Sequence, residues 1–239
     1  MTDGADRPGR RSDEDDHPVV VLVPGLGLDA RSWHLVRAAL TTRVEVVTLP
    51  SMGRRAPRGC DLHVEQQADR LLQALPRGRD VVLVGHSAGC PVVVEAAARS
   101  PHVLGVVLVG PVTDPRARTW PRMLAGWLAT APRERPSEVP SVLPQYRSTG
   151  AGSMLRGMNQ MRRYRTHVGL AAVPVPVHVV RGEHDRIARQ DWCTRLAGLG
   201  AGEVTSVPAG AHMVPLTHPG AVVAGIERLL ARVGPVSRR

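Results

Sequence analysis

The sequence predicts an α/β protein built on a doubly wound, mostly parallel six-stranded sheet, with a helical cap inserted into it. Three observations favour this fold class. Short apolar runs without alternation recur along the 239 residues, as in parallel strands buried on both faces. Segments with the apolar spacing of helices lie between most of these runs, in the order expected of right-handed crossovers. This alternation fails only between residues 115 and 173.

The predicted strands and helices of the core follow one another regularly along the chain. Strands are assigned to apolar, largely β-branched runs, and helices to segments whose apolar residues recur at three and four positions. The predicted strands cover residues 19–23, 44–49, 81–84, 103–109, 175–180 and 203–207. The predicted helices cover residues 30–40, 62–75, 92–99, 189–199 and 220–232. A chain of this length can bury a substantial core in one domain.

Residues 115–173 are predicted to form a cap over the carboxyl ends of the strands. They contain helical patches and a cluster of prolines between Pro132 and Pro144, but no strong strand signal. The chain therefore divides into a disordered tail (1–17), a core (18–114 and 174–233) and the cap (115–173). Because a lid presents side chains to the substrate, we expect a few apolar side chains to bind it: Trp120, Met123, Trp127, Met158 and Met213.

The net charge of +10 at pH 7 raises the question of a nucleic-acid or membrane partner. The basic residues are all arginines, and they are dispersed along the chain with only short pairs such as Arg54-Arg55 and Arg162-Arg163. No apolar run reaches the roughly 20 residues needed to span a bilayer. We therefore expect a small-molecule substrate, with no nucleic acid and no membrane as partner. The sequence is compatible with a homodimer.

The cysteines indicate a reducing compartment. Cys60, Cys90 and Cys193 lack metal-ligand spacing, and their odd number fits poorly with a disulfide framework. Residues 1–17 lack the apolar segment of a secretory signal. We expect a cytoplasmic protein with no metal and no cofactor, in which Cys90 has a packing role.

The stretch Gly85-His86-Ser87-Ala88-Gly89 lies between a predicted strand and a predicted helix, and it favours a nucleophile turn. The glycines allow a tight reversal in which neighbouring backbones come close. Ser87 then lies at the tip, and the backbone N–H of Ala88 is placed to stabilise an oxyanion beside it.

A serine nucleophile needs a base, and the base needs a carboxylate to orient it. His212 is the favoured base because it follows the last predicted strand in a loop of small residues. His86 adjoins Ser87, but adjacent residues in such a turn point apart, so we expect it only to support the site. Asp185 follows a strand and is the favoured acid; Asp114, which follows the preceding strand, is the alternative.

These motifs together resemble those of the α/β-hydrolase superfamily. They are the Pro24-Gly25-Leu26-Gly27 loop, the Ser87 turn, Arg181-Gly182-Glu183-His184-Asp185 and Gly210-Ala211-His212-Met213, in that order. The resemblance implies that Ser87 is the nucleophile, His212 the base and Asp185 its acid, and that the Leu26 N–H is the second oxyanion donor. Pro24 occupies the position at which the family commonly has histidine. Because the implied donor is the backbone N–H of Leu26, this difference leaves the donor unchanged. The compact layout is similar to the plant methylesterase and hydroxynitrile lyase branch.

The resemblance implies a serine hydrolase with a Ser-His-Asp triad that cleaves a small, mostly apolar ester, thioester or lactone through an acyl-enzyme. One alternative is a cyclase or lyase that tailors natural products, with the same triad acting as acid and base. A second alternative is a non-catalytic protein that binds a ligand on the hydrolase fold. Members of the branch named above include lyases and receptors, so all three remain open at this point.

Overall fold

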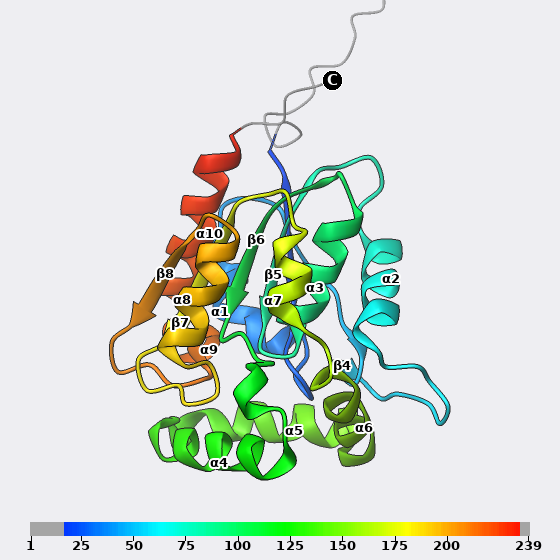
Figure 1. Cartoon of the computed structure of the whole chain (residues 1–239), viewed down its shortest axis with the longest axis vertical. Coiled ribbons are helices and arrows are strands. Elements are labelled where there is room, and N and C mark those ends of the chain that lie inside the picture. Colours follow the sequence, from blue (N-terminus) through cyan, green and yellow to red (C-terminus); the bar gives the residue numbers. More distant parts are fainter. Residues whose placement is uncertain (1–16, 235–239) are drawn as a thin grey trace, which may run out of the picture.

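The computed structural model describes residues 17–234, so the predicted N-terminal tail lies outside it except for His17. Its centre is a six-stranded sheet, shown with its flanking helices in Figure 1. In chain order the strands are β1 (Val19–Val23), β2 (Val44–Val46), β5 (Val81–His86), β6 (Val103–Val109), β7 (Val177–Gly182) and β8 (Glu203–Val207).

All neighbouring strands of this sheet are parallel, in the order β2-β1-β5-β6-β7-β8. The chain winds outward from β1 to β2, returns to β5 and then winds outward in the other direction. The strand order thus reverses between β1 and β5, where Val23 is level with Gly85. Ligands of open α/β sheets bind outside the carboxyl ends of the strands at such a reversal.

Helices cover both faces of the sheet, which confirms the predicted fold class (Figure 1). Successive residues of β1 point to opposite faces. Val19, Val21 and Val23 join one apolar cluster, and Val20 and Leu22 join the other. The first cluster is covered by α2 (Val64–Ala74), α3 (Gly89–Arg99) and α8 (Gln190–Leu199), and the second by α1 (His34–Ala39) and α10 (Pro219–Val233).

The segment 115–173, here called the cap segment, contains helices and short 3-10 turns. Its helices are α4 (Trp120–Thr130), α5 (Val139–Thr149), α6 (Ala151–Met161) and α7 (Thr166–Ala171). In Figure 1, α4, α5 and α6 form a layer beyond the carboxyl ends of the strands. The last helix, α7, packs against α3 and α8, and its Leu170 is fully buried in the core.

The structure differs from the sequence-based expectation most at one strand, although β7 also begins and ends two residues later than the predicted strand 175–180. The predicted strand 44–49 is interrupted after Val46, and the chain continues as β3 (Leu49–Pro50), which pairs with β4 (Gly53–Arg54) in a separate ladder. Ser51, with φ at +69°, turns the chain between the two. A short helix that was not predicted, α9 (Val214–Thr217), follows the His212 loop. Within residues 17–234 no helix is long and apolar enough to cross a membrane.

Candidate active site

Ser87 lies in a sharp turn between β5 and α3. Its φ of +51° is in the left-handed region, which non-glycine residues rarely adopt. The turn is held by the Ser87 N–H, which donates to the Val109 carbonyl at 2.8 Å, and by the Ser87 carbonyl, which accepts from the Cys90 N–H at 3.0 Å. A Cβ on Gly89 would lie 2.6 Å from the carbonyl oxygen of Val23, so only glycine fits there.

Ser87, His212 and Asp185 form one hydrogen-bonded chain. The Ser87 Oγ lies 2.9 Å from His212 Nε2, and His212 Nδ1 lies 2.7 Å from Asp185 Oδ2. These residues come from the carboxyl ends of β5, β7 and β8, so the parallel sheet brings together positions up to 125 residues apart. Such a chain can move a proton from the serine hydroxyl to the imidazole.

The Asp185 carboxylate is held ionised in a fully buried position. Burial by itself raises its pKa, but His212 and the N–H groups of Ala188 and Ile187 outweigh that effect and keep the pKa below its ordinary value. Those two amides donate to Asp185 Oδ1 at 2.9 and 2.8 Å. For His212, burial lowers the pKa, but the adjacent Asp185 outweighs burial and raises it. The pair is therefore suited to hold a proton on the imidazole.

The alternative acid, Asp114, has a different partner. Its carboxylate accepts from the backbone N–H of Arg116 at 2.9 Å and pairs with the Arg116 guanidinium at 2.7 Å. Of the two candidate acids, Asp185 is thus the one hydrogen-bonded to His212.

His86 supports the His212 loop from beneath. Its Nε2–H donates to the His212 carbonyl at 3.1 Å, and its ring packs edge-on against Trp33, with ring centroids 6.1 Å apart. Its Nδ1 is buried without a hydrogen-bond partner. Burial, together with the positive potential of His212, lowers the pKa of His86 to about 3, so the ring is neutral at physiological pH.

The two amides predicted to stabilise an oxyanion lie on neighbouring loops. A Cβ on Gly25 would lie 3.1 Å from Ser87 Cβ, so the loop after β1 touches the serine turn. In the part of the chain that the structure describes, neither the Leu26 N–H nor the Ala88 N–H has a protein acceptor. Both donors are thus available to a ligand.

Glu134 is a residue of the site that sequence reasoning missed. Its Oε1 accepts from the backbone N–H of His212 at 2.8 Å and of Met213 at 3.1 Å. Burial raises the pKa of Glu134, and this effect outweighs the lowering caused by His212 and by the two amides. The cap segment is thereby hydrogen-bonded to the loop that carries His212. No local pattern marks this acid, which lies between Arg133 and Arg135 in a proline-rich stretch.

The five side chains predicted to bind substrate occupy varied positions. Trp120 and Trp127 are 40% and 55% exposed, and Trp120 packs against the guanidinium of Arg162, which lies 5.7 Å from its ring centroid. Met123 is half-buried, and Met158 lines an outer groove with Tyr146 and Leu155. Met213 is buried with Leu28 and Leu216. Their contact with a substrate remains a prediction.

A small cavity lies directly beside the candidate oxyanion donors. It has room for about one water molecule and is walled mostly by apolar side chains. Its lining comprises Leu26, Ser51, Met52, Leu62, Val64, Gln67, Ala88, Val92, Gly157 and Met161. None of the five predicted substrate residues lines it. Within residues 17–234, no group of three histidine, cysteine or acidic residues could hold a metal ion.

Comparison with known proteins gives consistent matches to this fold. A model of the Alpha/beta hydrolase family matches residues 20–225. Pimeloyl-[acyl-carrier protein] methyl ester esterase of Methylococcus capsulatus is 28% identical, in an alignment that covers 84% of this chain and 90% of that protein. Two solved structures share the fold. A thermophilic esterase covers 92% of each chain, with a TM-score of 0.74 and 20% identity. MenH from S. aureus covers 90% of this chain and 94% of its own, with a TM-score of 0.73 and 15% identity.

The chain therefore belongs to the alpha/beta hydrolase family, as its motifs indicated. The match covers the sheet, the cap segment and the loops that carry Ser87, Asp185 and His212. Within this family it is an enzyme of the carboxylic ester hydrolase type.

Proposed function

We propose that the protein is a cytoplasmic serine hydrolase that cleaves a small, mostly apolar ester, thioester or lactone through an acyl-enzyme. The observation that carries this proposal is the hydrogen-bonded chain from Ser87 Oγ through His212 to Asp185, with distances of 2.9 and 2.7 Å. The cytoplasmic location is supported by three free cysteines, two of them buried.

In the acylation step, Ser87 Oγ attacks the substrate carbonyl carbon while its proton passes to His212 Nε2. The carbonyl oxygen becomes an oxyanion, which the N–H groups of Leu26 and Ala88 stabilise. Asp185 stabilises the imidazolium and keeps Nδ1 protonated. His212 then returns the proton to the leaving alcohol or thiol as the carbon–oxygen or carbon–sulfur bond breaks. Ser87 remains acylated.

In the second step, His212 takes a proton from water, and the resulting hydroxide attacks the acyl carbon of the ester on Ser87. The second tetrahedral oxyanion uses the same two amides. Its collapse releases the carboxylic acid and returns the proton to Ser87 Oγ. For a lactone, both products remain one molecule, a hydroxy acid.

The small apolar cavity beside Leu26 and Ala88 has room for about one water molecule, so it favours an apolar group no larger than about a methyl at this position. Its lining includes Met52, Val92 and Met161, and its only polar side chains are Ser51 and Gln67. The Gln67 side-chain amide donates to the Pro50 carbonyl at 2.6 Å, so that amide is already engaged. A methyl group of a small apolar substrate that occupies this space would gain burial without leaving a charge unpaired.

The decisive experiment combines covalent labelling with product analysis. Wild type and Ser87→Ala are incubated with a fluorophosphonate and measured as intact proteins by mass spectrometry. We expect labelling of wild type and none of Ser87→Ala, whose thermal unfolding should match wild type. Methyl esters, thioesters and lactones of increasing acyl length then follow, and products that gain one water identify hydrolysis. Turnover that survives in Ser87→Ala would contradict the proposal, and products without added water would indicate cyclase or lyase chemistry.

A further inference from the structure

The exposed apolar side chains of the molecule are concentrated on the layer formed by α4, α5 and α6. Ten large hydrophobic side chains are exposed in the described part of the chain, and seven of them lie on these helices. They are Trp120, Leu124, Trp127 and Leu128 on α4, Val139 and Leu143 on α5, and Leu155 on α6. The four on α4 recur at helical spacing and form one stripe. We call these seven side chains the apolar cap face.

Helix α4 is packed against the core along one narrow side only. Gly126 lies against the loop after β7, since a Cβ there would be 3.4 Å from the Arg186 carbonyl oxygen. Thr130 is buried, and its Oγ1 accepts from the Arg186 N–H at 3.0 Å. The leucines and tryptophans of α4 are each at least 40% exposed. A helix of this composition ordinarily buries such side chains, so the stripe is a surface without a partner.

The same segment carries most of the net charge. Residues 115–173 contain ten of the 31 arginines but only two of the 21 acidic residues, Glu134 and Glu138. Neither acid is exposed: Glu134 bonds to the His212 loop, and both carboxylate oxygens of Glu138 are buried. Asp191, on α8, is paired with Arg116 and Arg189. The outer surface of the cap segment is therefore apolar and positive.

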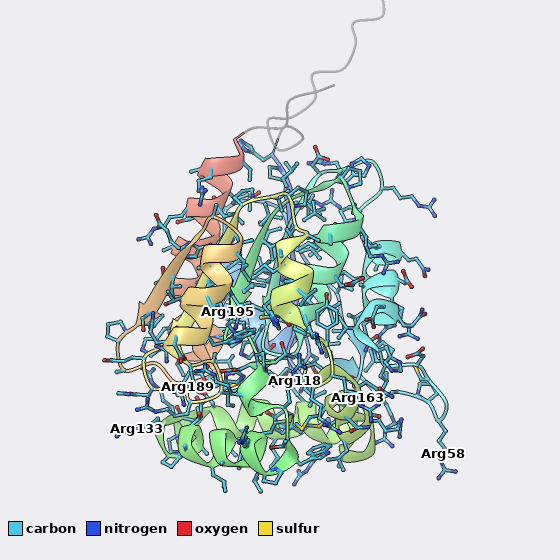
Figure 2. The ribbon with its side chains drawn as sticks, viewed as in Figure 1. Arg58, Arg118, Arg133, Arg163, Arg189 and Arg195 are labelled. Carbon is cyan, nitrogen blue, oxygen red and sulfur yellow. The ribbon has the colours of Figure 1, made fainter. Side chains whose placement is uncertain are left out.

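Several of these arginines are free to bind an anion. Within residues 17–234, Arg133, Arg147 and Arg163 are exposed and have no hydrogen-bond or ion-pair partner. Figure 2 shows Arg133 and Arg163 on opposite sides of the helical layer, so positive charge flanks the apolar cap face. The fold thus gathers at one end of the molecule arginines that look dispersed in the sequence.

We propose that the apolar cap face is a docking surface for an anionic lipid bilayer. Tryptophan rings favour the boundary between lipid headgroups and acyl chains, leucines insert below it, and arginines bind phosphates above it. A second copy of the chain fits poorly, because it would bring two strongly positive surfaces together without an exposed acid between them. The inference departs from the sequence-based expectation of no membrane partner. The proposed docking needs only contact with the surface of the bilayer and does not need a membrane-spanning helix.

The test is co-sedimentation of the full chain with vesicles. Vesicles of phosphatidylcholine alone are compared with an equimolar mixture of phosphatidylcholine and phosphatidylglycerol. We expect binding to the mixed vesicles, weakened by added salt, and little binding to phosphatidylcholine. Tryptophan fluorescence provides a second measurement. Trp33 and Trp192 are fully buried, so a blue shift on binding would report on Trp120 and Trp127.

Matched variants locate the contact. Leu124→Ser with Leu128→Ser should lower the partition coefficient about tenfold or more, because these leucines insert. Leu199→Ser is the control, since Leu199 is 42% exposed at the end of α8, next to the start of β7 and at the opposite end of the sheet from α4, α5 and α6 (Figure 1). Arg147→Gln with Arg163→Gln should lower binding by about fivefold per arginine. Arg77→Gln, at the other end of the sheet, should not.

Three outcomes would overturn the proposal. The first is absence of binding to either kind of vesicle by folded wild type. The second is binding that Leu124→Ser with Leu128→Ser weakens no more than Leu199→Ser does. The third is a change in oligomeric state by analytical ultracentrifugation in the cap variants without any change in vesicle binding, which would make the face a contact between proteins. None of these measurements depends on hydrolytic activity, so they are independent of the function proposed above.

Discussion

Glu134, in the cap segment, accepts a 2.8 Å hydrogen bond from the backbone N–H of His212, 78 residues away in the sequence. The same carboxylate accepts from the N–H of Met213. The loop that carries the proposed base is therefore held from three sides: by Asp185 through its imidazole, by His86 through its carbonyl, and by Glu134 through its amide. A hydrogen bond to a charged group is typically worth about 1.5–3 kcal/mol.

Loss of the Glu134 carboxylate should impair catalysis without unfolding the protein. We expect kcat to fall about tenfold in Glu134→Ala, because two amides lose their acceptor and the imidazole is positioned less accurately. Glu134→Gln keeps an acceptor oxygen and should retain most of the activity. Steady-state kinetics and the rate of fluorophosphonate labelling check this. A labelling rate in Glu134→Ala equal to that of wild type would show that the contact does not position His212.

Asp185→Asn should change both the rate and its pH dependence. Asp185 raises the pKa of His212 above its ordinary 6.5, and activity requires neutral His212, so wild-type activity rises with pH through a value above 6.5. Without the carboxylate, burial lowers this pKa against only the smaller opposing effect of Glu134, so the acid limb should move to lower pH. The maximal kcat should fall by about 10⁴, as in the comparable change of a serine protease triad. Rate measurements between pH 5 and 9 test the shift; an acid limb that stays in place would contradict it.

Glu138 should destabilise the fold at neutral pH. Burial, with the charge of Glu134, raises its pKa from 4.5 to about 7, so ionisation is disfavoured in the folded protein. The penalty is absent below pH 4.5, grows as the pH rises and is complete above pH 7. Because the residue is only half-buried, solvent screening reduces it to about 1 kcal/mol.

Urea unfolding of Glu138→Gln tests this account. The free energy of unfolding should exceed that of wild type above pH 7 and equal it below pH 4.5. Glu227→Gln, an exposed change on α10, should show no such dependence. A constant difference across the pH range would mean that packing, not ionisation, causes the effect.

Gly89→Ala should distort the Ser87 turn. The added Cβ would lie 2.6 Å from the Val23 carbonyl oxygen, a backbone atom that cannot move easily. We expect a loss of about 1–3 kcal/mol in the free energy of unfolding, as for overpacked cores, together with reduced activity. Gly198→Ala is the matched control. It is also helical but meets nothing within 4 Å, so it should be neutral or stabilising by about 0.5–1 kcal/mol. Equal stability of the two variants would contradict the steric argument.

The core could be predicted from the sequence because its signals are local. The strands β1, β6 and β8 cover the predicted residues, since buried parallel strands are continuous apolar runs. The Ser87 turn has glycines at fixed positions, and the strand order then brings Asp185 and His212 to the same edge. The break after Val46 was missed because Val47 and Leu49 continue the apolar run and are themselves buried.

The cap segment was less predictable because its contacts are not local. Helix α4 is apolar on nearly every side, so its sequence does not indicate which side meets the core. Trp120 and Trp127 are both exposed, and their predicted contact with a substrate stays a prediction. Glu134 contacts the His212 loop, from which β7 and β8 separate it along the chain. No spacing in the sequence encodes such a contact.

The uneven distribution of charge gives the molecule a permanent electrostatic axis. Residues 115–173 carry a net charge of +8, while the other described residues, 17–114 and 174–234, together carry +3. The positive pole therefore coincides with the end of the molecule beyond the carboxyl ends of the strands (Figure 1). In the field of any large anionic body the protein would experience a torque as well as an attraction. It would arrive with the layer of α4, α5 and α6 foremost (Figure 1), before any short-range contact had formed.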